Sequence, residues 1–252
     1  LGGNIYRVTM GDNVAPGSWT MVKIASLGCD TTAACTDNRK FLFAPDVLAD
    51  GNGYIVLLGS GDREKPLLID NLVNNYFFTV KDQPTDADWL TDEFATCGAE
   101  VLCLDSLLSI GSGTPDATDL AAKKGTYLVL LPTEQVVTSA ITIFGVVTFS
   151  THSPALPDLD ACASNLGTAR VYNILHANSA AADGLTRSEE LPGDIGLPPS
   201  PVAGMVTLDD GETVPFCIGC SSASPLEGEE PEVPAAGVPA QSKRRIYWYI
   251  ER

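Results

Sequence analysis

Turn-forming residues interrupt this chain every few positions. It contains 23 glycines and 17 prolines in 252 residues, and they separate short runs rich in β-branched and aromatic residues. Long helices do not tolerate this spacing, because glycine and proline weaken helix interiors. With 44% hydrophobic residues, the chain is apolar enough to bury a core. The pattern therefore predicts an all-β fold of many short strands.

Each predicted strand is a short apolar run bounded by turn residues. The predicted strands are Ile5–Val8, Tyr54–Leu58, Tyr76–Val80, Thr126–Leu131, two strands within Val136–Phe149 separated at Gly145, Ala169–Leu175, Met205–Leu208 and Thr213–Cys217. Turns are expected at Gly51-Asn52-Gly53 and Gly59-Ser60-Gly61-Asp62, and a hairpin at Asp209-Asp210-Gly211-Glu212, because glycine and asparagine accept positive φ. The runs between Thr126 and Leu175 predict one antiparallel sheet.

Three segments depart from this strand pattern. Residues 84–121 are expected to form an insertion with one short amphipathic helix, indicated by the spacing of Leu104, Leu107, Leu108 and Ile110. Residues 221–240 are rich in Pro, Glu, Ala and Ser and predict an acidic, mobile linker. Residues 241–252 alternate Ile246, Trp248 and Ile250 with tyrosines, which predicts a terminal strand that closes an open sheet edge.

Short strands with a late terminal strand are typical of a sandwich or a propeller. Propeller blades of roughly 40 to 50 residues would divide this length into about five units, of which the strand pattern shows three or four. We therefore expect residues 1–220 to be the C-terminal part of a β-propeller with loop insertions and one short helix.

Seven cysteines suit an oxidising compartment, so the chain is expected to be exported. The spacing of Cys29 with Cys35 and of Cys97 with Cys103 predicts two local disulfides, with separate free thiols as the alternative. Cys217 and Cys220 form a CxxC pattern, but no second CxxC exists for a zinc ribbon and no thioredoxin pattern precedes it. A structural disulfide involving Cys162 is expected instead, and the odd count leaves one thiol free or paired outside the chain.

Charge and composition exclude several functions. The formal net charge of −17 argues against nucleic-acid binding, which needs clustered Lys and Arg. The longest apolar stretch, Val136–Phe149, is too short and too interrupted by polar residues for a membrane-spanning helix. A calcium loop through Asp50 and Asn52 lacks the further carboxylates that such a loop needs, so a plain turn is expected.

No catalytic centre is evident in the sequence. The GxSxG, GxxxxGK and GxGxxG motifs are absent, and the chain has only two histidines, His152 and His176. Both are expected to be polar residues at strand ends rather than general bases. Arg63 is expected to lie in a charged turn, and Arg170 to need a carboxylate partner if it is buried. We therefore expect the protein not to be an enzyme.

Several segments resemble, in order, the C-terminal β-propeller of the PilC/PilY family of type IV pilus-associated proteins. The matching segments are Leu1-Gly-Gly-Asn-Ile-Tyr-Arg7, Gly59-Ser-Gly-Asp-Arg-Glu64, Asn75-Tyr-Phe-Phe-Thr-Val-Lys-Asp82, Leu131-Pro-Thr-Glu-Gln-Val-Val-Thr-Ser-Ala140, Asn165-Leu-Gly-Thr-Ala-Arg-Val-Tyr172 and Pro198-Pro-Ser-Pro-Val-Ala-Gly204. The resemblance implies an extracellular propeller, at the bacterial cell surface or pilus tip, that acts in pilus assembly, twitching motility and adhesion. It implies pilin or minor pilins as partners, together with an unknown surface receptor and a polypeptide upstream of Leu1.

The resemblance also limits what is expected of cofactors. The family's acidic calcium loop would lie before Leu1, so no metal residue is assigned in this chain and calcium is expected only in a longer parent protein. Two other propeller functions stay open. One is a secreted quinone-dependent dehydrogenase, and the other is a lectin-like carbohydrate-binding module, since a propeller fold does not fix function.

Overall fold

The computed structural model describes residues 2–11, 15–31, 35, 38–66, 73–155, 166–193, 196–209, 211–221 and 228–229. The strands are β1 (Asn4–Thr9), β2 (Thr20–Ser26), β3 (Asp46–Asp50), β4 (Gly53–Gly59), β5 (Tyr76–Asp82), β6 (Leu108–Ile110), β7 (Gly125–Val129), β8 (Gln135–Val136), β9 (Ile141–Ile143), β10 (Val146–Ser153), β11 (Thr168–Leu175), β12 (Ser188–Glu190), β13 (Val202–Thr207), β14 (Thr213–Ile218) and β15 (Gly228–Glu229). The helices are α1 (Phe94–Cys97) and α2 (Ala117–Ala122), with short 3₁₀ turns η1 (Pro16–Ser18), η2 (Thr91–Glu93) and η3 (Leu104–Ser106). Strands therefore dominate the described part of the chain, and the all-β prediction is confirmed.

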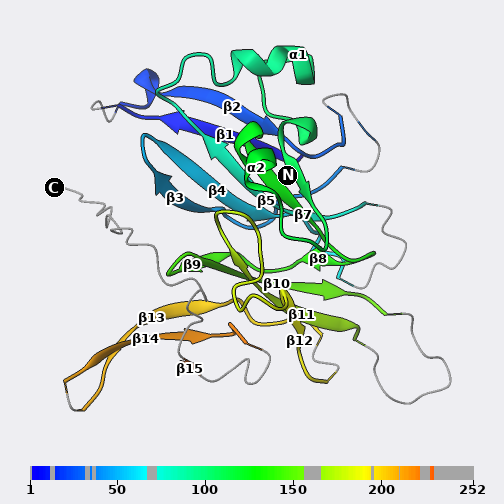
Figure 1. Cartoon of the computed structure of the whole chain (residues 1–252), viewed down its shortest axis with the longest axis vertical. Helices are drawn as coiled ribbons and strands as arrows, with labels where there is room; N and C mark the ends of the chain where they lie inside the picture. The colour runs from blue at the N-terminus through cyan, green and yellow to red at the C-terminus, as the bar shows by residue number, and fades with distance from the viewer. Residues whose placement is uncertain are drawn as a thin grey trace.

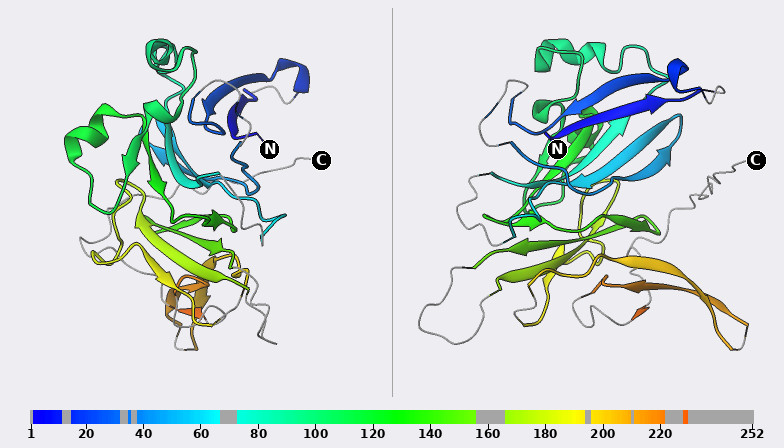
Figure 2. Two further views of the ribbon diagram at one scale, coloured as in Figure 1. Left: turned by 90° about the vertical axis from the view of Figure 1, so that its right-hand side faces the viewer. Right: turned by 180° about the vertical axis from the view of Figure 1, so that it is seen from behind.

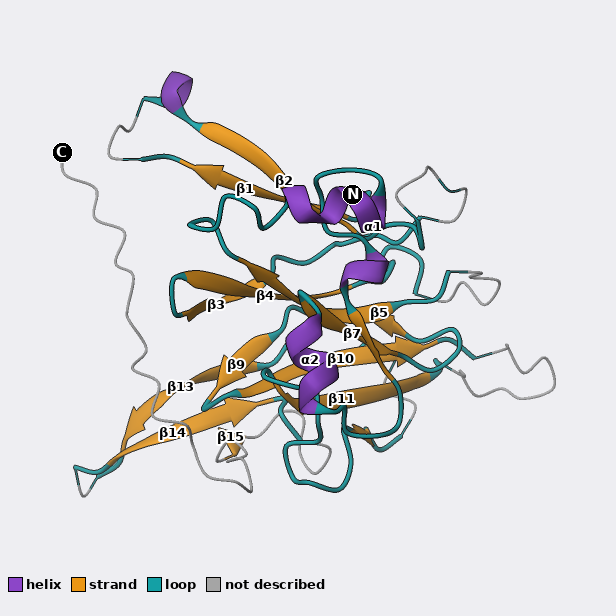
Figure 3. Ribbon diagram, turned by 45° about the horizontal axis from the view of Figure 1, so that its top comes forward, coloured by secondary structure: helices purple, strands orange, loops and turns teal. Residues whose placement is uncertain are grey.

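Four sheets follow one another along the chain. Sheet A is β1-β2, sheet B is β3-β4-β5-β7-β6, sheet C is β12-β11-β10-β8 with β9 on β10, and sheet D is β13-β14-β15. The sheets lie one above another in chain order (Figure 1), and the two further views show the same layers. The short helices lie on the outside of this stack (Figure 3). Within the described ranges no sheet closes on itself.

Sheets A and B share one apolar core. Ile5 of β1 and Ile24 of β2 pack in a buried cluster with Leu58 of β4 and Phe78 of β5. Leu102, from the loop after α1, is fully buried in the same cluster. Its backbone extends sheet A, because its N–H donates to Ile24 O at 3.0 Å and its carbonyl accepts from Ser26 N at 2.8 Å. The loop after α1 therefore ties sheet A to sheet B.

Sheets B and C share a second core, built around stacked aromatic rings. The Phe77 ring of β5 lies parallel to the Phe149 ring of β10, with centroids 3.9 Å apart. Phe149 in turn stacks on Tyr172 of β11 at 4.9 Å. Leu57 and Ile174 are buried in the same cluster. Both layers alternate inward and outward residues, so each sheet presents one apolar face to its neighbour.

Two local predictions from the sequence are wrong. The run Thr126–Leu131 was expected to share a sheet with the strands that follow it, but β7 pairs with β5 and β6 of sheet B. The spacing from Leu104 to Ile110 predicted a helix, but it forms η3 and then β6, which pairs parallel with β7. Leu104, Leu107 and Ile110 are buried, and the pairing with β7 outweighs the helical spacing because four residues are too few to establish a period.

Two of the three turn predictions are confirmed, whereas Gly59 ends β4 and Ser60–Asp62 form an extended connection before a turn at residues 63–64. Asp50 pairs with Gly53, so β3 and β4 are joined by a two-residue turn with Gly51 at φ +57°. Thr207 pairs with Thr213 across the hairpin between β13 and β14, where Gly211 has φ +86°. Strands β2, β3 and β12 were not predicted, because their runs mix apolar with charged or small residues. No helix among the described residues is long and apolar enough to span a membrane.

Most of the predicted linker and the predicted terminal strand lie outside the described residues. Within residues 221–240, Gly228–Glu229 forms β15 and pairs with Cys217 and Ile218 of β14. The predicted strand at 241–252, with its Trp248 stripe, is not described.

Candidate functional site

The Gly59-Ser60-Gly61-Asp62 segment joins sheet B to sheet C. Val136 donates its N–H to Ser60 O at 3.0 Å, so the end of β4 bonds to β8 of the next sheet. A Cβ on Gly59 would lie 2.4 Å from the Val136 side chain, and one on Gly61 would lie 2.3 Å from Val136 O. The glycines predicted as turn residues therefore permit a close backbone approach between two sheets.

A buried carboxylate, Glu134, lies beside this junction. Its Oε2 accepts from Leu131 N at 2.8 Å, and its two oxygens accept from the Tyr172 hydroxyl at 3.0 and 3.1 Å. Thr151 Oγ1 donates to Oε1, and the Glu134 carbonyl accepts from Asn75 Nδ2 at 3.2 Å. Four donors, one from each of four segments, thus converge on one residue that is almost fully buried.

The hydrogen bonds of this cluster have a structural role. Burial, and then the neighbouring Glu134 carboxylate, raises the pKa of the Tyr172 phenol far above its usual value. The phenol therefore stays protonated and donates its hydrogen to Glu134. Buried polar groups whose hydrogen bonds are all made hold one packing arrangement in place. We infer that this cluster fixes how sheet C sits on sheet B.

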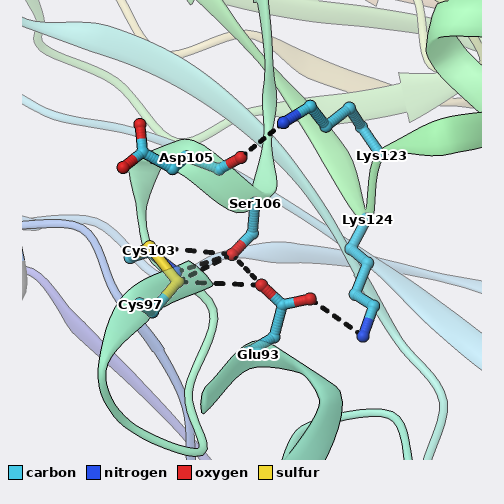
Figure 4. The surroundings of a disulfide bond; sticks show 7 residues. All are labelled: Glu93, Cys97, Cys103, Asp105, Ser106, Lys123 and Lys124. Atoms are coloured by element: carbon cyan, nitrogen blue, oxygen red, sulfur yellow. Dashed lines mark hydrogen bonds and ion pairs between the residues drawn. A yellow bond between two sulfur atoms is a disulfide. The ribbon is translucent and has the colours of Figure 1, made fainter. Parts of the chain in front are cut away.

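A second buried polar cluster surrounds the Cys97–Cys103 disulfide (Figure 4). Ser106 Oγ donates to Glu93 Oε2 and accepts from the Cys103 N–H at 3.0 Å. Figure 4 shows the Glu93 carboxylate between Ser106 and Lys124, whose Nζ lies 2.9 Å from Glu93 Oε1. The disulfide and this carboxylate together fix the loop that carries Leu102 into the core.

Lys124 connects the same cluster to the start of the insertion. Its Nζ lies 4.6 Å from the centre of the Trp89 ring, a cation–π contact. The Trp89 indole N–H donates to Lys81 O of β5 at 3.3 Å. The insertion expected at residues 84–121 is thus anchored to sheet B at both ends, and it supplies β6 to that sheet.

Removing the Cys97–Cys103 disulfide with the C97A/C103A double substitution should destabilise the fold. Loss of the cross-link alone costs about 2 to 3 kcal/mol for a loop of this size. We expect a larger loss, because the freed loop also carries the buried Leu102 away from β2. Urea unfolding followed by circular dichroism measures the change.

The matched control is C29A/C35A, since that disulfide has the same sequence separation of 6. Cys35 is exposed. Removing this disulfide should therefore lower the free energy of unfolding by no more than the loss of a cross-link alone, about 2 to 3 kcal/mol. Equal losses for the two double variants would contradict the special role of the Cys97–Cys103 loop.

The other cysteines also form local pairs. Cys29 pairs with Cys35 as the spacing predicts, and Cys217 pairs with Cys220. The expected disulfide between Cys162 and one of these last two is therefore wrong, because each already has a partner three residues away. Cys162 itself lies outside the described residues.

The buried Arg39 secures the Cys29–Cys35 loop to sheet B. Its Nε donates to Asn74 O at 2.7 Å and its Nη1 to Leu27 O at 3.2 Å, while Nη2 pairs with Asp30. The guanidinium also lies 4.2 Å from the centre of the Tyr76 ring. These partners satisfy a buried cation that would otherwise be costly.

The residues weighed from the sequence as functional candidates are separate from one another and have structural partners. Arg170 pairs with Glu190 at 2.8 Å, and the Arg63 guanidinium lies 5.7 Å from the Phe43 ring. His152 Nε2 lies 2.6 Å from Leu166 O, and His176 Nδ1 lies 2.9 Å from Gly145 O. The structure does not bring these four residues together.

The described part of the chain contains no metal cluster, and a surface hollow found there carries no charged side chain. No group of three or more His, Cys, Asp or Glu residues there is arranged to hold a metal ion. One hollow of about 250 Å³ is lined by Gly2, Gly3, Asn4, Tyr6 and Phe41. None of these side chains is charged or nucleophilic.

The buried groups that organise the sheets were not found from the sequence. Glu134, Glu93 and Arg39 are charged residues in short polar stretches, where surface exposure is the ordinary expectation. The signal available was only indirect, since Glu134 lies in one of the segments that resemble the PilC/PilY family. In the structure, these three buried charged residues hold loops and strands of neighbouring sheets together.

One of three comparisons with known proteins found a match. No family model and no curated protein sequence matches the chain. Among solved structures, the crystal structure of the Pseudomonas aeruginosa PilY1 C-terminal domain is similar, with a TM-score of 0.56 and 15% sequence identity. The match covers 91% of this chain and 56% of that chain. The chain therefore has a PilY1-like fold and spans little more than half the length of the domain it matches.

Proposed function

We propose that this chain is a non-enzymatic interaction module of an extracellular protein associated with type IV pili. The observation that carries the proposal is the stack of four sheets, which is similar over nearly all of its length to the PilY1 C-terminal domain. The three disulfides are compatible with an extracellular location. The proposal includes the finer fold assignment, in which the stacked sheets are blades of a β-propeller.

The surface of the chain supports binding by shape rather than by charge. A net charge of −17 opposes attraction to anionic cell surfaces. The outer face of sheet A carries Tyr6, Val8 and Met21 in exposed positions, and Val8 lies directly opposite Met21 in the β1–β2 register. We propose this face as an interaction surface, since contiguous exposed apolar faces often serve binding. Pilin or minor pilins are the proposed partners, and calcium binding is proposed only for a longer parent protein.

Deleting the region in the intact parent protein tests the proposal. We expect loss of surface pili or of twitching, with peptides of this chain found by mass spectrometry on sheared, washed pili of the unaltered strain. As a control, a parent carrying the exposed-site substitution Phe94→Ala should behave like the unaltered one, because Phe94 is 62% exposed.

Normal secretion, piliation and twitching without the region would overturn the proposal. Recovery of the chain only in the soluble secreted fraction would do the same. A quinone chromophore in the purified protein, or specific hits on a glycan array, would then direct attention to the dehydrogenase or lectin functions.

A further inference from the structure

Three buried polar atoms at the junction of sheets B and C have no hydrogen-bond partner in the described part of the chain. They are Gln135 Nε2 of β8, His152 Nδ1 of β10 and Asp62 Oδ1 in the segment after β4. Gln135 and His152 are each only 1% exposed. Because a buried polar atom without a partner is destabilising, three of them close together indicate a bound ligand.

The three side chains are neighbours in the fold. Gln135 lies directly opposite His152 in the β8–β10 register. Residues paired in this way project from the same face of a sheet, with their Cβ atoms about 5 Å apart. Asp62 N donates to Gln135 Oε1 at 2.7 Å, so the Asp62 side chain starts beside the same amide group. The Gln135 amide therefore lies between the other two residues.

The hydrogen bonds already made determine which of the three free atoms can donate. A backbone N–H only donates, so the Gln135 atom bonded to Asp62 N is the oxygen, and the free atom is the NH₂ group, a donor. A carbonyl only accepts, so His152 Nε2, which lies 2.6 Å from Leu166 O, carries the hydrogen. Nδ1 of the neutral ring is then an acceptor, as is the Asp62 carboxylate oxygen. A ligand there has to accept one hydrogen bond and donate two.

Water meets this requirement, and ions do not. A metal cation would face the hydrogens of the Gln135 amide, and no group of three or more His, Cys, Asp or Glu among the described residues is arranged to hold one. An anion would face the Asp62 carboxylate and the lone pair of His152 Nδ1. Buried waters typically make about three hydrogen bonds to groups that are otherwise unsatisfied. We propose that the junction binds an ordered water molecule, which accepts from Gln135 Nε2 and donates to His152 Nδ1 and Asp62 Oδ1.

This water connects two sheets. Asp62 follows β4 of sheet B, whereas Gln135 and His152 belong to paired strands of sheet C. The other oxygen of the Asp62 carboxylate, Oδ2, lies 2.5 Å from Lys40 Nζ. The water thus links an ion pair at the end of sheet B to a buried imidazole of sheet C.

A high-resolution crystal structure of the full chain tests the site. We expect one water within about 3 Å of Gln135 Nε2, His152 Nδ1 and Asp62 Oδ1. A site without electron density would overturn the proposal, as would a direct hydrogen bond between Gln135 and His152. An ion at the shorter distances of metal coordination, about 2.0 to 2.6 Å, would also overturn it.

Nuclear magnetic resonance of the full chain tests the same site in solution. A long-lived water there gives nuclear Overhauser effects to the side-chain amide protons of Gln135, and their absence in the unaltered chain would overturn the proposal whether or not any variant folds. His152→Phe should lose this water signal, because Nδ1 is removed. The control Thr79→Val should keep it, because it removes an unpartnered buried hydroxyl in β5 instead. An unchanged signal in folded His152→Phe would contradict the proposed role of Nδ1.

Discussion

Replacing Phe149 with alanine is expected to lower the free energy of unfolding by about 3 to 5 kcal/mol. Phe149 is fully buried, and its ring stacks on Phe77 of sheet B and on Tyr172 of sheet C. Truncation would remove apolar surface from the centre of the core between these sheets and leave a cavity that backbone hydrogen bonds on both sides prevent from collapsing. Urea unfolding followed by near-ultraviolet circular dichroism measures the loss.

Phe94→Ala is the matched control, since it removes the same atoms from a side chain that is 62% exposed. It should change the free energy of unfolding by about 0.5 kcal/mol or less. If Phe149→Ala cost no more than Phe94→Ala, the aromatic stack would not hold sheets B and C together. The prediction thus tests the stacking arrangement itself, on which the proposed blade architecture depends.

Strand positions could be predicted from the sequence where an apolar run is bounded by turn residues. Tyr76–Val80 and Ala169–Leu175 are nearly continuous apolar runs with turn residues at their ends, and both are central strands in the structure. Covered on both faces, such strands need no polar alternation. Their partners could not be predicted in the same way, because residues 83–124 separate β5 from its partner β7.

The failed helix prediction has its physical origin in a contact between segments distant in the sequence. The segment Leu104–Ile110 has apolar spacing compatible with a helical turn, yet β6 gains a ladder of backbone bonds with β7 that local spacing does not encode. The expected disulfide involving Cys162 failed for the opposite reason, because Cys217 pairs locally with Cys220 in the turn after β14.

The polar groups between the sheets were the least predictable part of the site. Arg39 and Glu134 are charged residues in short polar stretches, and only the packing of two sheets shows that both are buried. The half-buried Arg187, just before β12, also connects two sheets, since it donates to the carbonyl oxygens of Gly111 at 2.6 Å and Gly113 at 2.5 Å in the loop after β6. Burial lowers the pKa of this guanidinium, which has only carbonyl partners there. These polar side chains connect consecutive sheets through hydrogen bonds, in addition to the apolar cores between the sheets.

Replacing Glu134 with alanine should cost about 3 kcal/mol or more of unfolding free energy. The substitution leaves the Tyr172 hydroxyl, the Thr151 hydroxyl and the Leu131 N–H without their acceptor in a buried site. Each unsatisfied buried donor costs about 1 to 3 kcal/mol. Thermal and urea unfolding of the purified chain measure the loss, with Glu100→Ala at an exposed position as the control.

Glu134→Gln distinguishes lost hydrogen bonding from lost volume. The glutamine keeps the size of the side chain and one acceptor oxygen for Tyr172 and Thr151, but its amide nitrogen then faces the Leu131 N–H, which is also a donor. The loss should therefore be intermediate, at about 1 to 2 kcal/mol. If Glu134→Gln were as damaging as Glu134→Ala, the negative charge would be the essential feature. If both were harmless, the carboxylate would not organise the junction, and the packing of sheet C on sheet B would depend on the aromatic core alone.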